Sequence, residues 1–531
     1  MIILKSNKAQ YEYDIHSLVK AFYPEAEVRV LTPESVIKDK TIRERTPQME
    51  LAFSEETVIF RVMMTGGPGE VRRRNAKEGA LEKAGEGKMR PEEPDGGEAK
   101  EEPEEPDAGA PEQAHEYIWH VDEEAQRDYK NAFKRFLYHS LREETGISLP
   151  WGNLTGIRPT KIPMAMLEAG KGEEEILSFL KTQHLVSREK AALSLEIAER
   201  ERRILKPLHY ENGYSLYIGI PFCPTTCLYC SFTSFPISAW KARVSEYLGA
   251  LEKEIGYIAA VYGDRILDTV YIGGGTPTSL SAEELDRLLT KLKTSFDFNN
   301  VQEFTVEAGR ADSITEEKLR VLYRHNVSRI SVNPQTMKQE TLQFIGRRHT
   351  VEQVVNAFFM AREAGFDNIN MDIILGLPGE TAEDVRSTIR AIQTLEPDSL
   401  TVHSLAVKRA SRLAEWITAN GISALCNTEE TMRIAEDGAR SMGMAPYYLY
   451  RQKNMSGNFE NVGYAKEGKY GIYNILIMEE KQTIVALGAG SISKRVYQDG
   501  RIERCENVKD VAQYIERIDE MIERKRKLLE D

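Results

Sequence analysis

Three of the five cysteines in this 531-residue chain, Cys223, Cys227 and Cys230, fall within eight consecutive positions. Thiolates this close in one loop can share one inorganic centre, either a zinc ion or an iron–sulfur cluster. A closed zinc site needs four protein ligands, and the sequence has no further closely spaced pair of cysteines to complete it. Zinc would therefore require a distant His or Cys, whereas a cluster that leaves one position for another molecule needs only these three.

Polar or glycine-rich residues follow most of the other segments that read as strands. Gly273-Gly-Gly-Thr-Pro-Thr278 comes directly after one of them, and glycines let the backbone approach a ligand closely. An ordinary ion pair is the alternative interpretation for the carboxylates, and composition leaves open whether Arg347 or Arg348 faces inward. If these polar groups lie in a row across the expected strands, they favour the binding of one extended ligand. Glu307 follows the third expected strand, and Asn333 and Gln335 follow the fourth. Arg347 ends a short helix, and Asp372 lies within the fifth strand.

The elements that must position these groups alternate between strand and helix. The segments between the expected strands have helical length and an amphipathic pattern. Six successive β/α units predict a parallel sheet, open or closed into a partial barrel, with ligands at the carboxyl ends of its strands. The strands are expected at 215–220, 269–272, 303–306, 330–332, 368–374 and 399–402.

The alternation of strands and helices predicts an α/β fold class, and we expect four parts along the chain. They are an N-terminal α+β module over 1–122, a helical connector over 123–210, a partial (β/α)6 barrel over 211–405 and a C-terminal α/β cap over 406–531. Residues 65–113 hold too few large apolar side chains to order themselves, so we expect a disordered acidic insertion between two strands of the first module.

Two further segments carry specific expectations. In the cap, 473–478 and 483–487 are predicted to be strands. The glycine-punctuated loop 151–161 is basic, and could meet an anionic ligand or carboxylates, although exposed charge on a capped loop is the simpler interpretation.

The net charge of −13 is concentrated in one place, because residues 91–111 contain nine acidic residues and one basic residue. The rest of the chain is only mildly acidic, so charge neither requires nor excludes an anionic partner, and nucleic acid is not the expected one. No apolar run is long enough to span a bilayer, and residues 1–10 show no signal-peptide pattern. Together with few, clustered cysteines, this predicts a cytoplasmic protein with no membrane partner.

The cysteine spacing, with Tyr229 before the third cysteine, resembles the signature of the radical S-adenosylmethionine (SAM) superfamily. A longer set of motifs resembles the oxygen-independent coproporphyrinogen III oxidase group, which includes HemN, HemW and HemZ, and the HemZ branch most of all. These motifs are Tyr217-Ile-Gly-Ile-Pro-Phe-Cys223, Gly273-Gly-Gly-Thr-Pro-Thr278, Val306-Glu-Ala308, Ile345-Gly-Arg-Arg-His349 and Ile374-Leu-Gly-Leu-Pro-Gly379.

This resemblance implies a 4Fe–4S cluster on the three cysteines, with the methionine end of SAM at the fourth iron. By matching position, Tyr217 and Tyr229 would contact SAM near the cluster. The resemblance places Gly274, Gly275 and Thr276 at the methionine end of SAM, and Glu307, Gln335, Arg347, Asp372 and Ala406 along its carboxylate, ribose and adenine.

The same resemblance implies an enzyme that oxidatively decarboxylates two propionates of coproporphyrinogen III, giving protoporphyrinogen IX with the help of an electron donor still to be identified. A haem-binding or haem-delivery protein on the same scaffold is the alternative. The sequence departs from the oxidases after the third cysteine, where Ser231 and Phe232 stand in place of a pair that includes a further cysteine, and Gly219 replaces a histidine. These departures bring it closer to the haem-chaperone branch.

Overall fold

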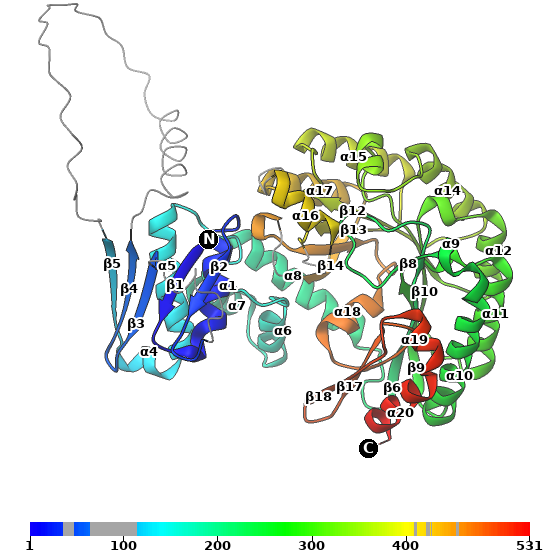
Figure 1. Cartoon of the computed structure of the whole chain (residues 1–531), viewed down its shortest axis with the longest axis horizontal. Helices are drawn as coiled ribbons and strands as arrows, with labels where there is room; N and C mark the ends of the chain where they lie inside the picture. The colour runs from blue at the N-terminus through cyan, green and yellow to red at the C-terminus, as the bar shows by residue number, and fades with distance from the viewer. Residues whose placement is uncertain are drawn as a thin grey trace, which may run out of the picture. The chain divides into compact units, whose positions relative to one another are not determined.

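The computed structural model describes residues 1–35, 47–63, 114–407, 411–420, 425, 427–452 and 456–530. The chain forms two compact units (Figure 1), one made of Met1–Thr155 with Ser178–Arg188 and the other of Gly156–Leu177 with Glu189–Asp531. The expected disordered insertion at 65–113 lies outside the described residues. The expected four-part division is finer than these two units and stays a prediction.

The first unit contains a five-stranded sheet with the order β2-β1-β3-β4-β5. Helix α1 (Glu12–Phe22) connects two parallel strands, and α5 (Tyr129–Thr145) packs beside it. Strands β4 and β5 are antiparallel with Met63 opposite Ala114, so the segment between them joins two neighbouring strands of one sheet. The strands are β1 (Ile2–Ser6), β2 (Val28–Leu31), β3 (Met49–Phe53), β4 (Thr57–Met63) and β5 (Ala114–His120).

Four more helices come before the large sheet begins in the chain. A helical pattern was predicted here from apolar residues at helical spacing. The helices are α4 (Glu123–Arg127), α6 (Lys161–Glu168), α7 (Glu173–His184) and α8 (Arg188–Leu205).

The second unit is built on an eleven-stranded sheet with the order β14-β15-β13-β12-β11-β10-β9-β6-β16-β17-β18. The six predicted strands lie next to one another in sequence order and run parallel, so the predicted partial (β/α)6 barrel is confirmed. Most positions along these strands are buried, as expected for a parallel sheet covered on both faces. The six are β6 (Gly213–Ile220), β9 (Ile266–Gly274), β10 (Glu303–Gly309), β11 (Arg329–Val332), β12 (Ile369–Leu375) and β13 (Ser399–Ser404).

Helices cover the outer side of this curved sheet (Figure 1). Three of them, α11, α14 and α15, begin with a capping box in which a Ser or Thr and the residue three positions later exchange hydrogen bonds. Local sequence therefore fixes where each helix starts after its strand. The outer helices are α10 (Val244–Tyr262), α11 (Ala282–Ser295), α12 (Glu316–Arg324), α14 (Val351–Glu363) and α15 (Ala382–Leu395).

The residues after the barrel extend the same sheet at both edges. Strand β15 pairs antiparallel with β13 at one edge, and β16 pairs parallel with β6 at the other. Strands β14, β17 and β18 continue outward from these two. These strands are β14 (Ala445–Tyr450), β15 (Asn461–Ala465), β16 (Thr483–Leu487), β17 (Ile492–Val496) and β18 (Ile502–Glu506), and the short β7 (Phe222–Cys223) and β8 (Phe235–Pro236) form a separate pair.

The prediction of a strand at 473–478 was wrong, because this segment is helix α18 (Ile472–Glu479). A short apolar run does not distinguish a buried strand from a buried helix by periodicity alone. Tyr473 and Leu476, three residues apart, are buried on it, and Tyr473 packs with Tyr271 of β9. The helix lies on the path from β15 to β16, and so from one edge of the barrel sheet to the other.

One buried carboxylate, Glu254 of α10, contacts the last helices of the chain. It accepts hydrogen bonds from Gly488 N at 2.9 Å and Tyr514 Oη at 2.6 Å, and Lys525 Nζ lies 2.7 Å away. The Glu254 and Lys525 side chains are fully buried, so each satisfies the charge of the other. The remaining helices are α9 (Ile237–Trp240), α13 (Gln339–Phe344), α16 (Arg412–Asn420), α17 (Glu429–Ser441), α19 (Val511–Glu516) and α20 (Ile518–Leu529).

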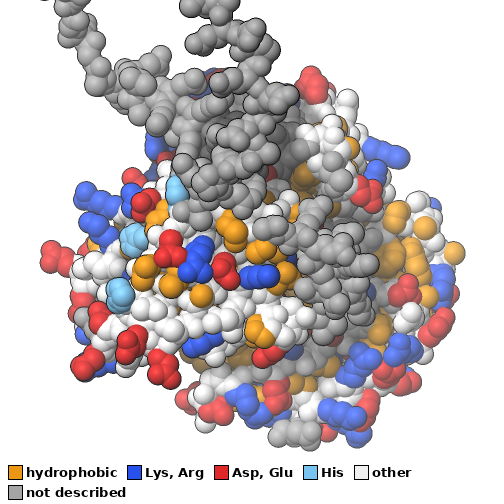
Figure 2. Space-filling model, turned by 60° about the vertical axis from the view of Figure 1, so that its left-hand side comes forward, with side chains coloured by type: hydrophobic (Ala, Val, Ile, Leu, Met, Phe, Trp, Pro, Cys, Tyr) orange, Lys and Arg blue, Asp and Glu red, His pale blue; other side chains and the backbone are white. Residues whose placement is uncertain are grey.

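Two properties of the described residues bear on possible partners. On the face shown in Figure 2, Lys and Arg side chains are interspersed with Asp and Glu. No helix in the described part of the chain is both long and apolar enough to cross a membrane.

Candidate cofactor site

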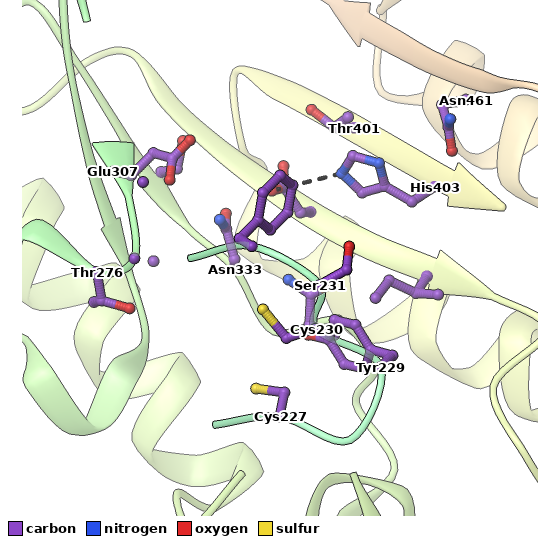
Figure 3. A pocket seen from close by; sticks show the side chains of 18 of the residues that line it. Cys227, Tyr229, Cys230, Ser231, Thr276, Glu307, Asn333, Thr401, His403 and Asn461 are labelled. Atoms are coloured by element: carbon purple, nitrogen blue, oxygen red, sulfur yellow. Dashed lines mark ion pairs between the residues drawn. The ribbon is translucent and has the colours of Figure 1, made fainter. Parts of the chain in front are cut away.

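The three cysteines lie in the loop that follows β6, which we call the cysteine loop (Pro221 to Phe232). Figure 3 shows Cys227 and Cys230 of this loop. All three are free thiols, and Cys223 Sγ lies 3.4 Å from Thr276 Oγ1. Burial raises the pKa of Cys223 to about 11 and also raises the pKa of Cys230. Both would therefore stay protonated at neutral pH without a metal, whereas iron would stabilise the thiolates.

The glycine turn after β9 supports this loop through its backbone. Gly275 N donates to Ile220 O and Thr276 N donates to Phe222 O, both at 2.7 Å. A Cβ atom on Gly275 would lie 2.6 Å from Phe222 O, and Gly274 has a φ of +105°. Only glycine fits both positions, so the turn and the cysteine loop are held together at closer range than side chains permit.

Glu307, at the end of β10, is part of an aromatic environment. Tyr271 Oη donates to Glu307 Oε1 at 2.5 Å, and the Tyr271 ring stacks with Tyr473 of α18 at a centroid distance of 4.6 Å. Tyr217 stacks with both rings. Burial raises the pKa of Glu307 to about 7, so this carboxyl is poised between its neutral and charged forms near neutral pH.

Asp372, on β12, has a different environment. Asn370 Nδ2 donates to its Oδ1 at 2.6 Å, and His403 Nε2 lies 3.7 Å from Oδ2 (Figure 3). Although burial opposes ionisation, His403 and Asn370 hold the pKa of Asp372 below its ordinary value. Gln335 N donates to Asp372 O at 2.9 Å, and Gln335 has a φ of +70°. The site thus offers one charged acceptor and one carboxyl that readily holds a proton.

Arg347, rather than Arg348, faces the interior. Its Nη1 donates to Asn333 O at 2.5 Å and its Nη2 donates to Tyr229 Oη at 3.3 Å. Arg347 is buried and Arg348 is exposed, which resolves the choice that composition left open. The inward direction of Arg347 follows from its position just after α13, where Arg347 N still bonds back to Leu342 O.

One cavity of about 390 Å³ collects the predicted site residues. Its volume is in the range of small-molecule sites. Their specific roles in binding stay predictions. The predicted residues that line it are Tyr217, Cys223, Cys227, Tyr229, Cys230, Gly274, Gly275, Thr276, Asn333, Glu307, Gln335, Arg347, Asp372 and Ala406.

Other residues lining this cavity were not found from the sequence. His403 ends a predicted strand as the other candidates do, so its position was a usable signal. Arg310 likewise follows a predicted strand and the Val306-Glu-Ala308 motif, whereas the rest lie between positions 448 and 478, and nothing in their spacing links them to the cysteines. The missed residues include Arg310, His403, Tyr448, Tyr450, Asn461, Asn474, Ile477 and Met478.

The basic loop 151–161 contacts carboxylates at the C-terminal end of α18. Arg158 Nη1 donates to Met478 O at 2.7 Å, and Arg158 Nη2 lies 2.8 Å from Glu480 Oε2. Thr160 Oγ1 donates to Glu479 Oε1 at 3.3 Å. Of the interpretations offered for this loop, contact with carboxylates is the one observed.

The residues present fit an iron–sulfur cluster and a polar ligand. Among the described residues, Asn333 Oδ1 and Arg347 Nε are buried without a hydrogen-bond partner, and both residues line the cavity. A bound polar molecule would supply those partners. No three His, Cys, Asp or Glu side chains in the described part of the chain converge on a single metal ion. A 4Fe–4S cluster attaches its thiolates to separate irons and does not need such convergence.

Comparison with known proteins defines the class. Residues 217–392 match the family described as the radical SAM superfamily, which includes the cysteine loop and strands β6–β12. The cofactors of this superfamily are a 4Fe–4S cluster and SAM, which agrees with the residues that line the cavity.

Individual relatives narrow the class further. The chain is 43% identical over 415 residues to the oxygen-independent coproporphyrinogen-III oxidase-like protein HemZ of Bacillus subtilis, covering 77% of this chain and 83% of that protein. It is also 41% identical over 198 residues to the haem chaperone HemW of the same organism, covering 36% of this chain and 51% of that protein. The coproporphyrinogen III oxidase of Escherichia coli is 32% identical over 196 residues, which cover 37% of this chain and 42% of that protein.

Among solved structures, coproporphyrinogen III oxidase (HemN) from Escherichia coli aligns with 63% of this chain and 73% of its own, with a TM-score of 0.46 and 23% identity. The extent of the match to HemZ places the chain in a family: it belongs to the radical SAM superfamily and, within it, to the oxygen-independent coproporphyrinogen-III oxidase-like proteins.

Proposed function

We propose that this protein catalyses the oxygen-independent oxidative decarboxylation of coproporphyrinogen III to protoporphyrinogen IX. The observation that carries the proposal is that one cavity joins the cysteine loop and the strand ends to residues that have no part in the SAM motifs. Those residues, among them Tyr448, Tyr450 and Asn461, provide room and contacts for a second ligand beside the cofactor. The names of relatives support a porphyrinogen as that ligand.

The protein residues would hold and orient the reactants. Asp372 and Gln335, linked through a backbone hydrogen bond, would contact SAM on one side, and the glycine turn at Gly274 would admit its methionine end. When bound, the cluster and SAM supply an organic radical that removes a hydrogen atom from a substrate carbon. Each propionate would then lose carbon dioxide and one electron, which an acceptor in the cell must take up, to leave a vinyl group.

Phe232 is placed to meet a pyrrole ring of a tetrapyrrole. It ends the cysteine loop, lines the cavity and exposes 74% of its surface. A large exposed aromatic ring at a cavity mouth is a favourable surface for stacking against another ring. We infer that Phe232 contacts the substrate and thereby holds a propionate near the cofactors.

A haem-binding or haem-delivery function is the second candidate. The residues after Cys230 favour it, because Ser231 and Phe232 replace the pair that carries a further cysteine in the oxidases. The 41% identity to the haem chaperone HemW, over a segment that covers 36% of the chain, also supports it. In both proposals the ligand is a tetrapyrrole, the protein acts in the reducing cytoplasm, and an electron donor is a further partner.

One assay separates the two functions. The anaerobically reconstituted, reduced protein is incubated with SAM and coproporphyrinogen III, and products are separated by liquid chromatography. We expect 5′-deoxyadenosine and protoporphyrinogen in wild type and neither in Cys227→Ala. Tight haem binding with no porphyrinogen turnover would refute the oxidase proposal and support haem delivery.

A matched pair of variants tests the contact with Phe232. Phe232→Ala should weaken coproporphyrinogen binding by about tenfold, the scale of a lost aromatic contact of about 1.5 kcal/mol. Phe359→Ala, which removes a ring that is 48% exposed on α14, should leave binding unchanged. Equal binding by the two variants would contradict the assigned contact.

A further inference from the structure

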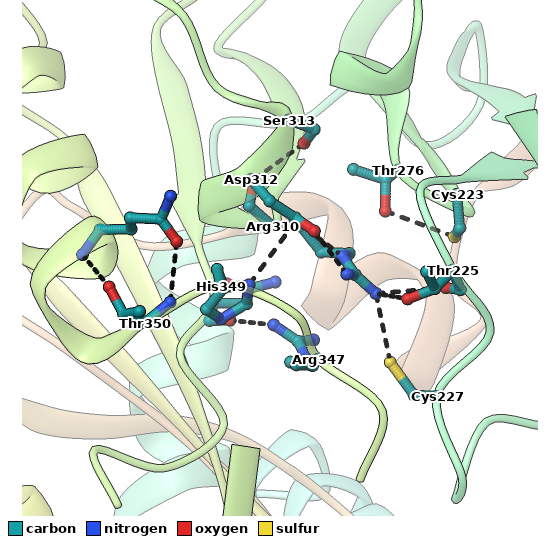
Figure 4. Close-up of polar contacts among 12 residues, drawn as sticks. Cys223, Thr225, Cys227, Thr276, Arg310, Asp312, Ser313, Arg347, His349 and Thr350 are labelled. Carbon is teal, nitrogen blue, oxygen red and sulfur yellow. Dashed lines mark hydrogen bonds and ion pairs between the residues drawn. The ribbon is translucent and has the colours of Figure 1, made fainter. Parts of the chain in front are cut away.

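Arg310 lies directly after β10 and is 2% exposed. Its Nη1 donates to Thr225 Oγ1 at 2.8 Å and to Thr225 O at 3.2 Å, both in the cysteine loop (Figure 4). The same Nη1 lies 3.7 Å from Cys227 Sγ, within the range of a hydrogen bond to sulfur. A buried guanidinium is therefore directed at one of the three thiols.

Asp312 fixes the orientation of this guanidinium. Arg310 Nε donates to Asp312 Oδ1 at 2.9 Å and Nη2 donates to Oδ2 at 2.6 Å, a bidentate arrangement that leaves Nη1 for the cysteine loop. Behind the carboxylate, fully buried His349 places Nδ1 3.5 Å from Asp312 Oδ1. The chain thus holds Arg310 from the side opposite to the sulfur.

The charge on Arg310 is maintained in this environment. Burial disfavours it, but Asp312 and Cys227 outweigh that penalty and keep the pKa of Arg310 above its ordinary value. Burial also opposes ionisation of Asp312, yet His349 and Arg310 hold the pKa of that carboxyl well below its usual range. A second buried guanidinium, that of Arg347, donates to Tyr229 Oη of the same loop at 3.3 Å.

We propose that Arg310 is a positioning residue that raises the reduction potential of the 4Fe–4S cluster by donating a hydrogen bond to the thiolate sulfur of Cys227. Reduction adds negative charge to the cluster, and a cationic donor at a ligand sulfur stabilises the reduced form more than the oxidised form. Because water is largely excluded from this side of the loop, the charge is weakly screened. The inference depends on cluster binding and not on which tetrapyrrole function is correct.

The test compares reduction potentials rather than activity. Wild type, Arg310→Gln and Arg310→Lys are reconstituted anaerobically, and iron and sulfide are counted. The fraction of reduced cluster is then measured by electron paramagnetic resonance at a series of fixed potentials. Arg320→Gln is the control, because Arg320 is largely exposed and pairs with Glu316 on the outer helix α12.

At the potential where wild type is half reduced, we expect the ratio of reduced to oxidised cluster to fall about tenfold in Arg310→Gln, which is about 59 mV for one electron. Arg310→Lys should shift in the same direction by less, because lysine keeps the charge but loses the fork that pairs with Asp312. The surface control should match wild type.

Unchanged potential in an Arg310→Gln protein with full iron would overturn the proposal. If Arg310→Gln holds no cluster, Arg310→Lys decides in the same way: a lower potential supports the proposal, and the wild-type potential overturns it. If neither variant retains iron, Arg310 serves only to fold the cysteine loop, and the proposal is likewise overturned.

Discussion

The carboxyl ends of strands β6–β12 and the segment 445–487 line the same cavity with different chemistry. The strand ends provide thiols, a glycine turn, a charged aspartate and buried arginines, all suited to a cluster and a polar cofactor. The described residues of the second region, which we call the closing segment, provide tyrosines, amides and the apolar side chains of α18. We propose that the strand ends hold the cofactors, whereas the closing segment, together with Phe232 of the cysteine loop, contacts the substrate.

The contrast between the strand ends and the closing segment requires the C-terminal part of the chain to stay folded onto the barrel. Lys525→Met leaves Glu254 buried without its cation and should reduce the free energy of unfolding by about 3–5 kcal/mol. Lys527→Met, on an exposed face of α20, should change it little. Urea unfolding followed by circular dichroism and tyrosine fluorescence measures both. An independent C-terminal transition, with the barrel unaffected, would contradict a single continuous sheet.

Asp372→Asn tests whether the strand ends bind SAM. Loss of the charged acceptor in a buried position should cost about 1.5–3 kcal/mol, which corresponds to a 10- to 100-fold weaker affinity for SAM. Equilibrium dialysis of the reconstituted protein with labelled SAM gives the affinity. Asp367→Asn is the matched control, since Asp367 is highly exposed and pairs with Lys469. Equal affinity in the two variants would remove Asp372 from the SAM site.

The closing segment is tested by Ile477→Trp, which adds volume to the cavity wall on α18. If this segment handles substrate, binding of coproporphyrinogen or haem should weaken about tenfold while SAM affinity changes less than twofold, because the lost room costs about 1.4 kcal/mol on the substrate side alone. Ile492→Trp, at an exposed position of β17, controls for the added ring. An equal loss of SAM binding would contradict the proposal that the closing segment contacts the substrate and not the cofactor.

Glu307 gives an effect that depends on pH. Its folded-state pKa is raised to about 7 from an ordinary value of 4.5, so its contribution to stability is complete below pH 4.5 and is lost as pH rises through 7. Glu307→Gln stays neutral and keeps an acceptor for Tyr271. Relative to wild type, the free energy of unfolding of the variant should therefore rise by up to about 2.5 kcal/mol between pH 5 and pH 8, since each unit of pKa shift is worth about 1.4 kcal/mol.

Urea unfolding at both pH values, on protein without cofactors, measures this difference. A stability difference between variant and wild type that is independent of pH would mean that Glu307 is not the titrating group.

The same contrast explains how far sequence alone could reach. Parallel strands separated by helices bring their carboxyl ends to one edge, so Cys223, Gly275 and Glu307 could be grouped from their places after expected strands, and Asp372 from its place within another. The residues of the closing segment could not be grouped with them in this way. Antiparallel β15 reverses direction, and α18 was mistaken for a strand because its short apolar run fits both forms.

Some contacts among the strand ends also could not be predicted from the sequence. Arg310 and Arg347 both follow strand or helix ends, but only their burial and partners distinguish them from the exposed Arg348. The link from Arg310 to Cys227 spans 83 positions and depends on the exact path of two loops. Such pairings arise from tertiary packing, which no local pattern encodes.

Iron content tests the central claim most directly, namely that the cysteine loop and the strand ends form one cofactor site. Wild type and the Cys223→Ala, Cys227→Ala, Cys230→Ala triple variant are reconstituted anaerobically with iron and sulfide, and protein-bound iron is counted. We predict about four irons per chain in wild type and none in the triple variant, as expected for one 4Fe–4S cluster. Equal iron in the two proteins would contradict the account.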